Sequence, residues 1–554
     1  MVDIDAPPAL AELIRSNLDL PQEQDANTDE GERVRWLRHA RMQTERLLET
    51  EGYFTPEIKV DVSEGLDRLH IAVQSGPQAH VDQVSIEFRG DITRQEAAHA
   101  ERMASLRAGW TLKSGAPFRQ ESWSKAKQAL LQKLVAKDYA AGSIAESAAE
   151  VDPQTARVNL RVVLDSGPPF TLGALEIIGL ESFSPDLVRR YSNLEAGEAY
   201  DQERLLALQT ALQNQVYFAS VAVEIDHDPQ HPEKVPVRVT LREAKTKHVN
   251  FGAGFSSNTG ARAEVSYRDA NLLDRAWSLA VGAQVDQKRQ FGYVDIYLPP
   301  RPNAYRDSFG LLAERTDIQG LRSQRSAVAA VRARHQGRIE TKLSLSLENE
   351  RLRKDNAAAT STQALALNYS WTYRAIDNVL DPREGYTLNL QVGGGVKGLL
   401  SDQNFVRGYS RFQFFQPVGN RDALILRSEL GYTAAKSRAG IPQDFLFRTG
   451  GAQTVRGYNY QSLGVSDGGA VVGGRNLIAA SAEYVHWLEK SQWGIAGFYD
   501  IGNAWDSGLR SSALVSGYGL GARWRSPAGP LAIDLAYGQQ DRKLRLHFAV
   551  AIAF

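Results

Sequence analysis

From residue 244 to the end of the chain, apolar residues recur at every second position in one segment after another. In residues 386–392, for example, tyrosine, leucine and valine alternate with threonine, asparagine and glutamine. Successive side chains of a β-strand point to opposite faces, so each segment predicts a strand with one apolar face. At about 20 residues for a strand with its loop, this part of the chain is expected to hold about 16 strands.

This number of strands favours a closed transmembrane barrel over residues 244–554. A soluble sandwich of two sheets would show the same alternation. Against the sandwich, the second face is small or charged, and it carries the glycines Gly517, Gly519 and Gly521. An open twisted sheet rarely exceeds about 10 strands, whereas a closed barrel leaves no edge unpaired in lipid. We therefore predict an all-β barrel of about 16 antiparallel strands.

The last segment of the chain shows the clearest alternation. Its apolar positions are Leu544, Leu546, Phe548, Val550, Ile552 and Phe554. A strand with this pattern that ends on an aromatic residue is similar to the C-terminal targeting signal of bacterial outer-membrane barrels. We therefore expect Phe548, Val550, Ile552 and Phe554 to form a targeting strand.

The first 243 residues instead alternate helical and strand patterns. In the last part of this region, the strand-like FTLGALEIIGL precedes two helical segments, and SVAVEID and VPVRVTLRE follow them. The same phases recur twice upstream, and Ser-Gly-Pro closes each of the two earlier units. Recurrence at a fixed spacing predicts a repeat array rather than three unrelated α+β domains. We expect β-α-α-β-β modules at residues 1–77, 78–168 and 169–243.

Composition and motifs exclude several classes of function. The net charge of −1 argues against a nucleic-acid binder held by a basic face. The absence of cysteine removes disulfides and thiolate metal sites, and it suits a protein of the bacterial envelope. Neither G-x-S-x-G, H-E-x-x-H nor a phosphate-binding G-x-x-x-x-G-K-[ST] loop occurs, so we expect no enzyme, cofactor or metal.

Two further absences concern membrane segments. There is no run of about 18 apolar residues, the length that a transmembrane helix requires. The N-terminal residues MVDIDAPPALAEL lack the basic and apolar regions of a signal peptide. If the protein is exported, we expect that its signal has already been removed.

The tetrapeptide VRGY occurs twice, at residues 406–409 and 455–458. The first copy lies in an alternating segment, which predicts that Arg407 is a lumen-facing residue of an ordinary strand. The second copy lies in the glycine-rich, polar FRTGGAQTVRGYNYQSLG, which predicts a loop of about 20 to 30 residues. Loops of this length are often functional. The candidate residues of this loop are Gly450, Gly451, Val455, Arg456, Gly457 and Tyr458.

Two carboxylates of the predicted barrel wall face its interior. Asp500 in GIAGFYDIGNAW and Glu483 in ASAEYVHWL both lie on the face of small residues. The planar guanidinium of Arg456 can give one carboxylate two hydrogen bonds at once. If the loop enters this interior, as the family resemblance given below implies, we expect Asp500 and Glu483 to be its wall partners, while Gly457 lets the backbone turn beside the wall.

The whole pattern resembles the outer-membrane insertase superfamily, whose β-α-α-β-β modules are called POTRA domains. The residues that carry the resemblance are the VRGY loop after Gly-Gly, the strand with Phe498-Tyr499-Asp500, and the turn NVLDPREGY at residues 378–386. The resemblance spans nearly the whole chain. It implies that the loop folds into the barrel lumen, where its arginine meets acidic residues of the wall.

The number of modules refines the resemblance. Three modules are similar to the TamA family, the barrel subunits of the translocation and assembly module. That resemblance implies insertion of outer-membrane proteins, autotransporters among them, a TamB-like inner-membrane-anchored partner, contact with outer-membrane lipid, and POTRA domains in the periplasm. It also implies a seam between the first and last strands that opens sideways, with residues near Phe251 beside residues near Val550. The alternatives are a polypeptide-secreting transporter of two-partner secretion, the central subunit of the general barrel assembly machinery, or a passive porin.

Overall fold

The computed structural model describes residues 2–18, 30–62, 69–301, 304–506, 514–526 and 529–553. The chain divides into two compact units. One unit consists of Met1–Ile178, Ser192–Leu212 and Val221–Thr240. The other consists of Gly179–Tyr191, Gln213–Ser220 and Leu241–Phe554.

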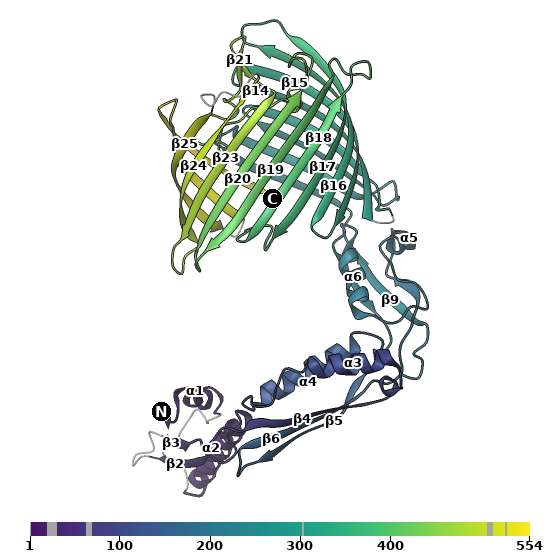
Figure 1. Cartoon of the computed structure of the whole chain (residues 1–554), viewed down its shortest axis with the longest axis vertical. Helices are drawn as coiled ribbons and strands as arrows, with labels where there is room; N and C mark the ends of the chain where they lie inside the picture. Colours follow the sequence, from purple (N-terminus) through teal and green to yellow (C-terminus); the bar gives the residue numbers. More distant parts are fainter. Residues whose placement is uncertain are drawn as a thin grey trace. The chain divides into compact units, whose positions relative to one another are not determined.

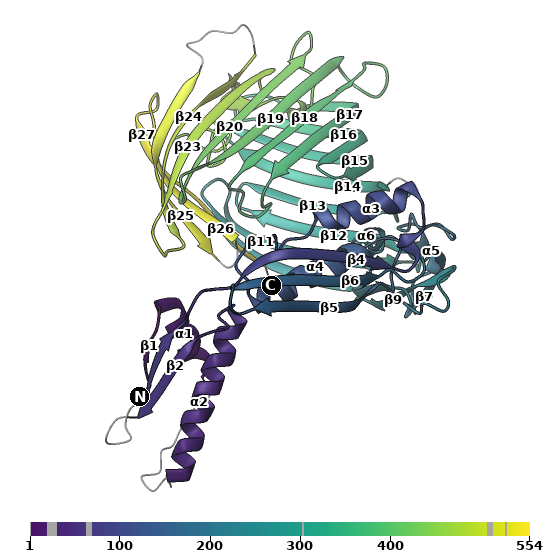
Figure 2. The same ribbon diagram turned by 60° about the horizontal axis from the view of Figure 1, so that its bottom comes forward.

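The first module contains a strand and a helix that the sequence patterns did not identify. Its elements are β1 (Val2–Asp5), α1 (Pro8–Asn17), α2 (Glu30–Thr50), β2 (Glu57–Val62) and β3 (Leu69–Gln74). The sheet order is β1-β3-β2, with β1 parallel to β3. Both helices lie beside this sheet (Figure 2), and Ile14, Leu48 and Ile71 are buried between the layers. A strand of four residues with alternating aspartates is too short to give a clear periodic signal.

The second module repeats this order. Its elements are β4 (His80–Arg89), the 3-10 turn η1 (Asp91–Thr93), α3 (Ala97–Ala108), α4 (Gln120–Val135), β5 (Ser143–Asp152) and β6 (Arg157–Asp165). The sheet order is β4-β6-β5, and the helices lie along it in Figure 1. Trp123, Leu130 and Leu134 recur at helical spacing on α4 and are buried in the core.

The third module has the same topology. Its elements are β7 (Leu172–Ile178), α5 (Pro185–Arg189), α6 (Gln202–Gln213), β8 (Phe218–Glu224) and β9 (Val235–Glu243). The Ser184 hydroxyl caps α5 by accepting the backbone N–H of Asp186 at 3.3 Å. The sheet order is β7-β9-β8. The predicted β-α-α-β-β order is therefore confirmed, whereas the limits at residues 77, 168 and 243 stay predictions.

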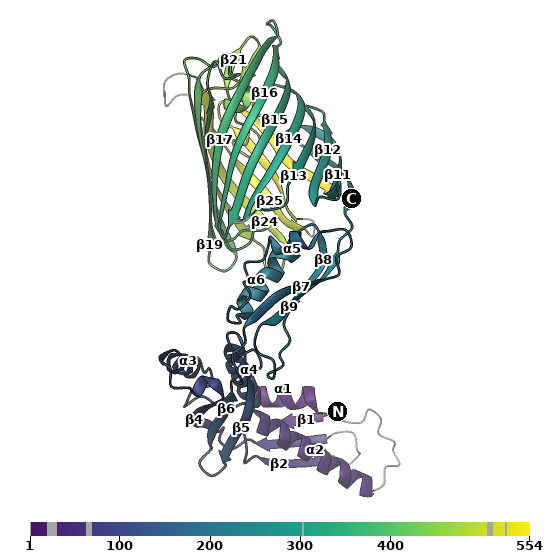
Figure 3. The ribbon, with the colours of Figure 1, turned by 90° about the vertical axis from the view of Figure 1, so that its right-hand side faces the viewer.

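Sixteen strands form the predicted barrel, which the structure confirms (Figures 1 and 3). In order around the barrel they are β10 (Lys247–Ser256), β11 (Gly260–Leu272), β12 (Trp277–Asp286), β13 (Arg289–Tyr297), β14 (Tyr305–Ile318), β15 (Leu321–Gln336), β16 (Ile339–Lys354), β17 (Thr360–Ile376), β18 (Gly385–Gly395), β19 (Phe405–Val418), β20 (Asp422–Ala434), β23 (Asn476–Trp487), β24 (Trp493–Trp505), β25 (Val515–Ser526), β26 (Gly529–Gly538) and β27 (Lys543–Ala553). The faces alternate as expected: on β16, Leu343 and Leu345 are about half exposed, whereas Ser346 and Glu348 are buried. Of the helices in the described residues, none is both long and apolar enough to cross a membrane.

The barrel closes where β27 meets β10, over a short ladder. Among the described residues, five pairs are in register there, from Gly252–Ala553 to Ser256–Ala549, whereas ten pairs join β10 to β11. Residues near Phe251 lie beside residues near Val550, as expected, and the register places Gly252 opposite Ala553 and Phe255 opposite Val550. Sequence patterns identify the two edge strands but leave the stagger that closes a barrel undetermined.

The predicted targeting strand is described only in part. The ring of Phe548 stacks on that of Phe255, with 5.5 Å between the ring centres. Val550 and Ile552 lie opposite Phe255 and Ala253 in the backbone register. Phe554 lies outside the described residues, and the targeting role of this strand stays a prediction.

Aromatic residues of the third module contact the turn between β11 and β12. The Tyr217 hydroxyl donates to the carbonyl of Ala276 at 3.1 Å, and the Asn271 amide lies 3.4 Å from the carbonyl of Ser182. The rings of Tyr217 and Phe183 pack edge to face, 5.2 Å apart. These segments, 179–191 and 213–220, therefore belong to the same compact unit as the barrel.

A fragment of residues 1–243 is expected to be soluble and folded, with a circular dichroism spectrum of mixed helix and strand. The reason is that each module has its own sheet, and the first two modules have separate apolar cores. A fragment of residues 1–168 is the control, because it lacks the Tyr217 and Phe183 side chains that contact the barrel turn. Aggregation of the longer fragment alone would contradict the predicted limit at residue 243.

Candidate functional site: the lumen loop

The loop that carries the second VRGY joins β20 to β23 and spans residues 435–475; we call it the lumen loop. It has 41 residues (475 − 435 + 1), so the expected length of 20 to 30 was too short. The difference is explained by a 3-10 turn, η3 (Gln443–Phe445), and a hairpin of β21 (Val465–Asp467) and β22 (Ala470–Val472). Elements of three residues are too short to be recognised by periodicity.

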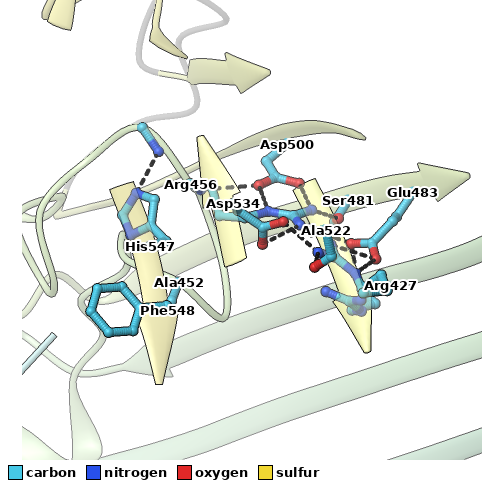
Figure 4. A network of polar contacts seen from close by, with 12 residues as sticks. Arg427, Ala452, Arg456, Ser481, Glu483, Asp500, Ala522, Asp534, His547 and Phe548 are labelled. Atoms are coloured by element: carbon cyan, nitrogen blue, oxygen red, sulfur yellow. Dashed lines mark hydrogen bonds and ion pairs between the residues drawn. The ribbon is translucent and has the colours of Figure 1, made fainter. Parts of the chain in front are cut away.

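Arg456 lies at the centre of a polar cluster on the inner wall (Figure 4), and its side chain is only 2% exposed. Its Nε and Nη2 atoms donate to the two carboxylate oxygens of Asp500 at 2.7 and 2.9 Å. Its Nη1 atom lies 2.8 Å from Glu483 Oε2 and 3.1 Å from Asp534 Oδ2. The backbone N–H of Arg456 also donates to Asp500 at 3.0 Å. The guanidinium therefore holds Asp500 in the two-bond geometry that a lysine cannot reproduce.

Two further arginines balance the charge of this cluster. Arg523 donates to Glu483 at 2.7 Å and to Asp534 at 2.6 Å. Arg427 lies 3.3 Å from Glu483, which thus contacts all three arginines. With Asp500, three arginines face three carboxylates in a buried site. Buried charges are tolerated only when they are paired and hydrogen-bonded, and here the pairing is extensive.

An aromatic ring covers the remaining face of the Arg456 guanidinium. The carbon Cζ of Arg456 lies 3.4 Å from the centre of the Phe498 ring. A guanidinium over an aromatic face gains a favourable interaction with the ring quadrupole. The Ser481 hydroxyl accepts a further hydrogen bond from Nη2 at 3.3 Å. The side chain is thus fixed by contacts from several directions.

Gly457 and Tyr458, which follow Arg456, hold the loop against the last strands of the barrel. Gly457 has φ +90°, and a Cβ atom there would lie 2.6 Å from the backbone nitrogen of Gly538, so a side chain would clash. Its N–H donates to His547 Nε2 at 3.0 Å, and Arg545 donates to its carbonyl. Tyr458 is buried, and its hydroxyl donates to the carbonyl of Ser516 at 3.0 Å.

The other candidate residues shape the loop upstream of Arg456. Gly450 and Gly451 have φ of +101° and +106°, in the left-handed region that glycine adopts readily. The N–H of Gly451 donates to the carbonyl of Val455 at 3.2 Å, which closes a tight turn. The side chain of Val455 is fully buried against Leu463 and neighbouring apolar residues.

Residues of β15 and β16 bind the lumen loop at a second place. The N–H of Gln443 in η3 donates to Glu350 Oε2 at 2.7 Å, and Ser323 donates to the other oxygen of Glu350 at 2.6 Å. Asp444, the next residue, forms an ion pair with Arg325. Near the hairpin, Lys354 lies 2.7 Å from Asp467. The loop is therefore held at both its start and its VRGY segment.

The first VRGY copy has different surroundings. Arg407 lies on the inner face of β19, donates to Gln391 at 3.1 Å, and stacks 4.9 Å from the centre of the Phe447 ring. In the described part of the chain it forms no ion pair with a carboxylate. The two copies are therefore not equivalent.

Sequence patterns identified Asp500 and Glu483 beside Arg456, and the structure brings all three together. The patterns missed Asp534, although it alternates with apolar residues on the small-residue face of its strand, as Asp500 does. They also missed His547 and Arg545, because a strand pattern does not tell which polar residues a distant loop contacts. Within the described residues, no group of three or more His, Cys, Asp or Glu side chains could hold a metal ion.

A barrel of sixteen strands that follows POTRA modules and holds an anchored lumen loop defines a class of outer-membrane proteins. The profile of the Omp85 superfamily domain matches residues 234–554, which are 321 residues (554 − 234 + 1) and more than half of the chain. The POTRA profile, a surface antigen variable number repeat, matches residues 170–244. The chain belongs to the Omp85 superfamily. This membership implies a location in the bacterial outer membrane, with the POTRA domains in the periplasm.

Similarity to individual relatives is low in identity and broad in coverage. Outer membrane protein assembly factor BamA of Nitratidesulfovibrio vulgaris is 23% identical over 381 residues, which are 65% of this chain and 47% of that protein. BamA of Neisseria meningitidis serogroup B is 21% identical over 580 residues, 91% of this chain and 71% of that protein. The chain thus spans about half to seven tenths of the length of these relatives.

A solved structure shows the same fold. The crystal structure of BamA from Haemophilus ducreyi lacking POTRA domains 1–3 has a TM-score of 0.72 and 16% sequence identity. The similarity covers 86% of this chain and 100% of the other. At this identity, the comparison supports the fold and not a shared activity.

Proposed function

We propose that the protein is a non-enzymatic insertase for outer-membrane barrel proteins. In this proposal the seam between β10 and β27 opens sideways, and a strand of an unfolded client pairs with the exposed edge of β10. The chemistry is the exchange of backbone hydrogen bonds between strands, so no cofactor or covalent step takes part.

The short ladder at the seam carries this proposal. Among the described residues, five pairs join β10 to β27, six join β26 to β27, and sixteen join β15 to β16. Each residue pair contributes to the backbone hydrogen-bond ladder, and the described ladder is shortest at the seam. An edge that opens in lipid has unpaired N–H and C=O groups, which makes pairing with an incoming strand favourable.

The occupied lumen supports insertion over secretion. A polypeptide-secreting transporter passes its client through the lumen, but here the lumen loop crosses from its contacts with Glu350 and Arg325 on β15 and β16 to Arg456 at the later strands. A passive porin also requires an open lumen, because its solutes pass through it. Sideways release into lipid needs no clear lumen.

We further propose that the protein acts as a TamA-like barrel subunit. The support is the presence of three modules before the barrel, with edge strands β5 and β8 available in the second and third sheets. In this assignment a TamB-like inner-membrane-anchored protein is the partner, and autotransporters and other barrel proteins are the clients. Edge strands are suitable sites for a partner or client strand to add.

Reconstitution tests the proposed function. The full-length protein is placed in liposomes, an unfolded barrel client is added, and the membrane-inserted, protease-protected client is measured over time. Liposomes with a control barrel that lacks POTRA domains provide the baseline. We expect faster insertion than in the control. Client recovered as soluble protein inside the vesicles would instead favour a secreting transporter, and insertion at the baseline rate would contradict the proposal.

A further inference from the structure

The turn between β10 and β11 touches two other parts of the barrel at the seam. The N–H of Ser257 donates to the carbonyl of Phe548 on β27 at 2.9 Å, and the N–H of Phe548 donates back to the Ser257 hydroxyl at 3.1 Å. The adjacent residue, Asn258, accepts the N–H of Ala452 in the lumen loop at 3.3 Å. The first hairpin thus meets the last strand and the lumen loop at consecutive residues.

The same stretch of loop holds the opposite edge of the seam. Five positions after Ala452, Gly457 donates to His547 Nε2 and accepts from Arg545, both on β27. Arg545 Nε also donates to the Asn459 side chain at 3.1 Å. Figure 4 shows Ala452, Arg456, His547 and Phe548 close together in this network. Residues 452–459 therefore bridge the seam from inside the barrel.

We propose that Asn258 is a positioning residue of a latch, in which the lumen loop holds both edges of the seam. The seam then separates only after the loop releases one edge. This inference rests on the proposed function for its biological use, but the latch itself is a property of the barrel without any client.

The contacts indicate which edge is released. On the side of β10, one hydrogen bond between two neutral groups links the loop to Asn258. On the side of β27, a charged donor, Arg545, contributes two bonds, and the Arg456 cluster lies close by. Charge-assisted hydrogen bonds are roughly twice as strong as neutral ones. When the seam opens, the lumen loop therefore remains bound to β23 to β27 and dissociates from the hairpin of β10 and β11.

Hydrogen–deuterium exchange of the full-length protein in detergent or lipid tests the latch. Asn258→Ala is expected to accelerate exchange of the Ser257 and Phe548 amides about fivefold, the effect of one lost hydrogen bond of ordinary strength. Exchange in β15 and β16 should not change. Asn258→Asp keeps an acceptor oxygen and should restore slow exchange. Asn404→Ala is the matched control, since Asn404 also accepts one loop N–H, from Lys397 at 2.7 Å, away from the seam.

Two further variants separate a latch from a local effect on the turn. Arg456→Ala should accelerate the same amides, and combining it with Asn258→Ala should add little, because both changes release one loop. Conversely, Asn258→Cys and Ala452→Cys joined by a short bis-maleimide should slow the exchange; the natural sequence contains no cysteine that would compete.

Unchanged seam exchange in Asn258→Ala, or equal acceleration in Asn404→Ala, would overturn the latch. Full additivity of the two seam variants would overturn it as well. None of these results depends on client insertion. Failure of the proposed function would appear only in the liposome assay, so the two failures are distinguishable.

Discussion

Replacing Arg456 with alanine is expected to lower the free energy of unfolding of the barrel by about 3–5 kcal/mol, the usual effect of breaking a buried ion pair from one side. The substitution removes the cation from Asp500 and Glu483, which are 0% and 2% exposed, and from Asp534. Their charges then lie buried with fewer partners, and water reaches them poorly. The loss is measurable as a lower temperature at which the folded barrel loses its heat-resistant mobility on gels.

Two further variants show whether the stability that Arg456 provides depends on the geometry of its guanidinium or on its charge alone. Arg456→Lys should restore little of the stability, because an ammonium cannot give Asp500 two parallel hydrogen bonds. Arg407→Ala should cost about 1–3 kcal/mol, since Arg407 has one hydrogen bond to Gln391 and stacks on Phe447 without an ion pair. Equal heat resistance of all three variants, with equal proteolysis of the lumen loop, would refute the anchoring role of Arg456.

A disulfide across the seam is expected to abolish client insertion and to restore it on reduction. Ser256→Cys and Ala549→Cys are suitable positions, because these residues are register partners. The hydrogen bond from Ser257 N–H to the Phe548 carbonyl makes Ser256–Ala549 a non-hydrogen-bonded pair, in which Cα atoms lie about 4.5 Å apart. That distance is within the range that a disulfide bridges.

A second disulfide, placed away from the seam, shows whether a crosslink anywhere in the barrel wall affects insertion. Ser346 and Ala366 are register partners on β16 and β17, within the continuous wall. Ser346→Cys with Ala366→Cys should leave insertion unchanged, because this pair does not separate in the proposed mechanism. Full insertion activity with the seam disulfide completely formed would refute sideways opening and leave the barrel as a passive scaffold.

Sequence patterns predicted the repeated modules, the number of barrel strands and the inward orientation of Glu483 and Asp500. These properties follow from local periodicity: two residues per repeat in a strand and 3.6 in a helix. On β24, for instance, Tyr499 is exposed while Phe498 and Asp500 on either side are buried, as the alternation requires. An arginine inside a glycine-rich loop was likewise visible in the sequence, and its place beside lumen carboxylates was implied by the family resemblance.

Features that depend on distant pairing were not predictable. The register of β10 against β27 depends on the stagger of the whole barrel, so the sequence indicated that the two edge strands are neighbours but not which residues pair. The contact of Asn258 with Ala452 joins residues 194 positions apart. The bond from Gln443 to Glu350 joins residues 93 positions apart, and neither pair has a distinctive motif. Short elements such as β1 and the β21–β22 hairpin gave too few residues for a period.

Site-specific photocrosslinking during insertion can show directly whether a client strand pairs with the opened edge of β10. A photoreactive residue replaces Ala253 on β10, whose partner at the closed seam is Ile552, and in a control it replaces Leu345 on β16. An unfolded barrel client is added to liposomes that contain either variant, and samples are irradiated as insertion proceeds. We expect a transient adduct between residue 253 and a terminal strand of the client, and none from residue 345. Complete insertion without an adduct at residue 253, or with equal adducts at both positions, would contradict it.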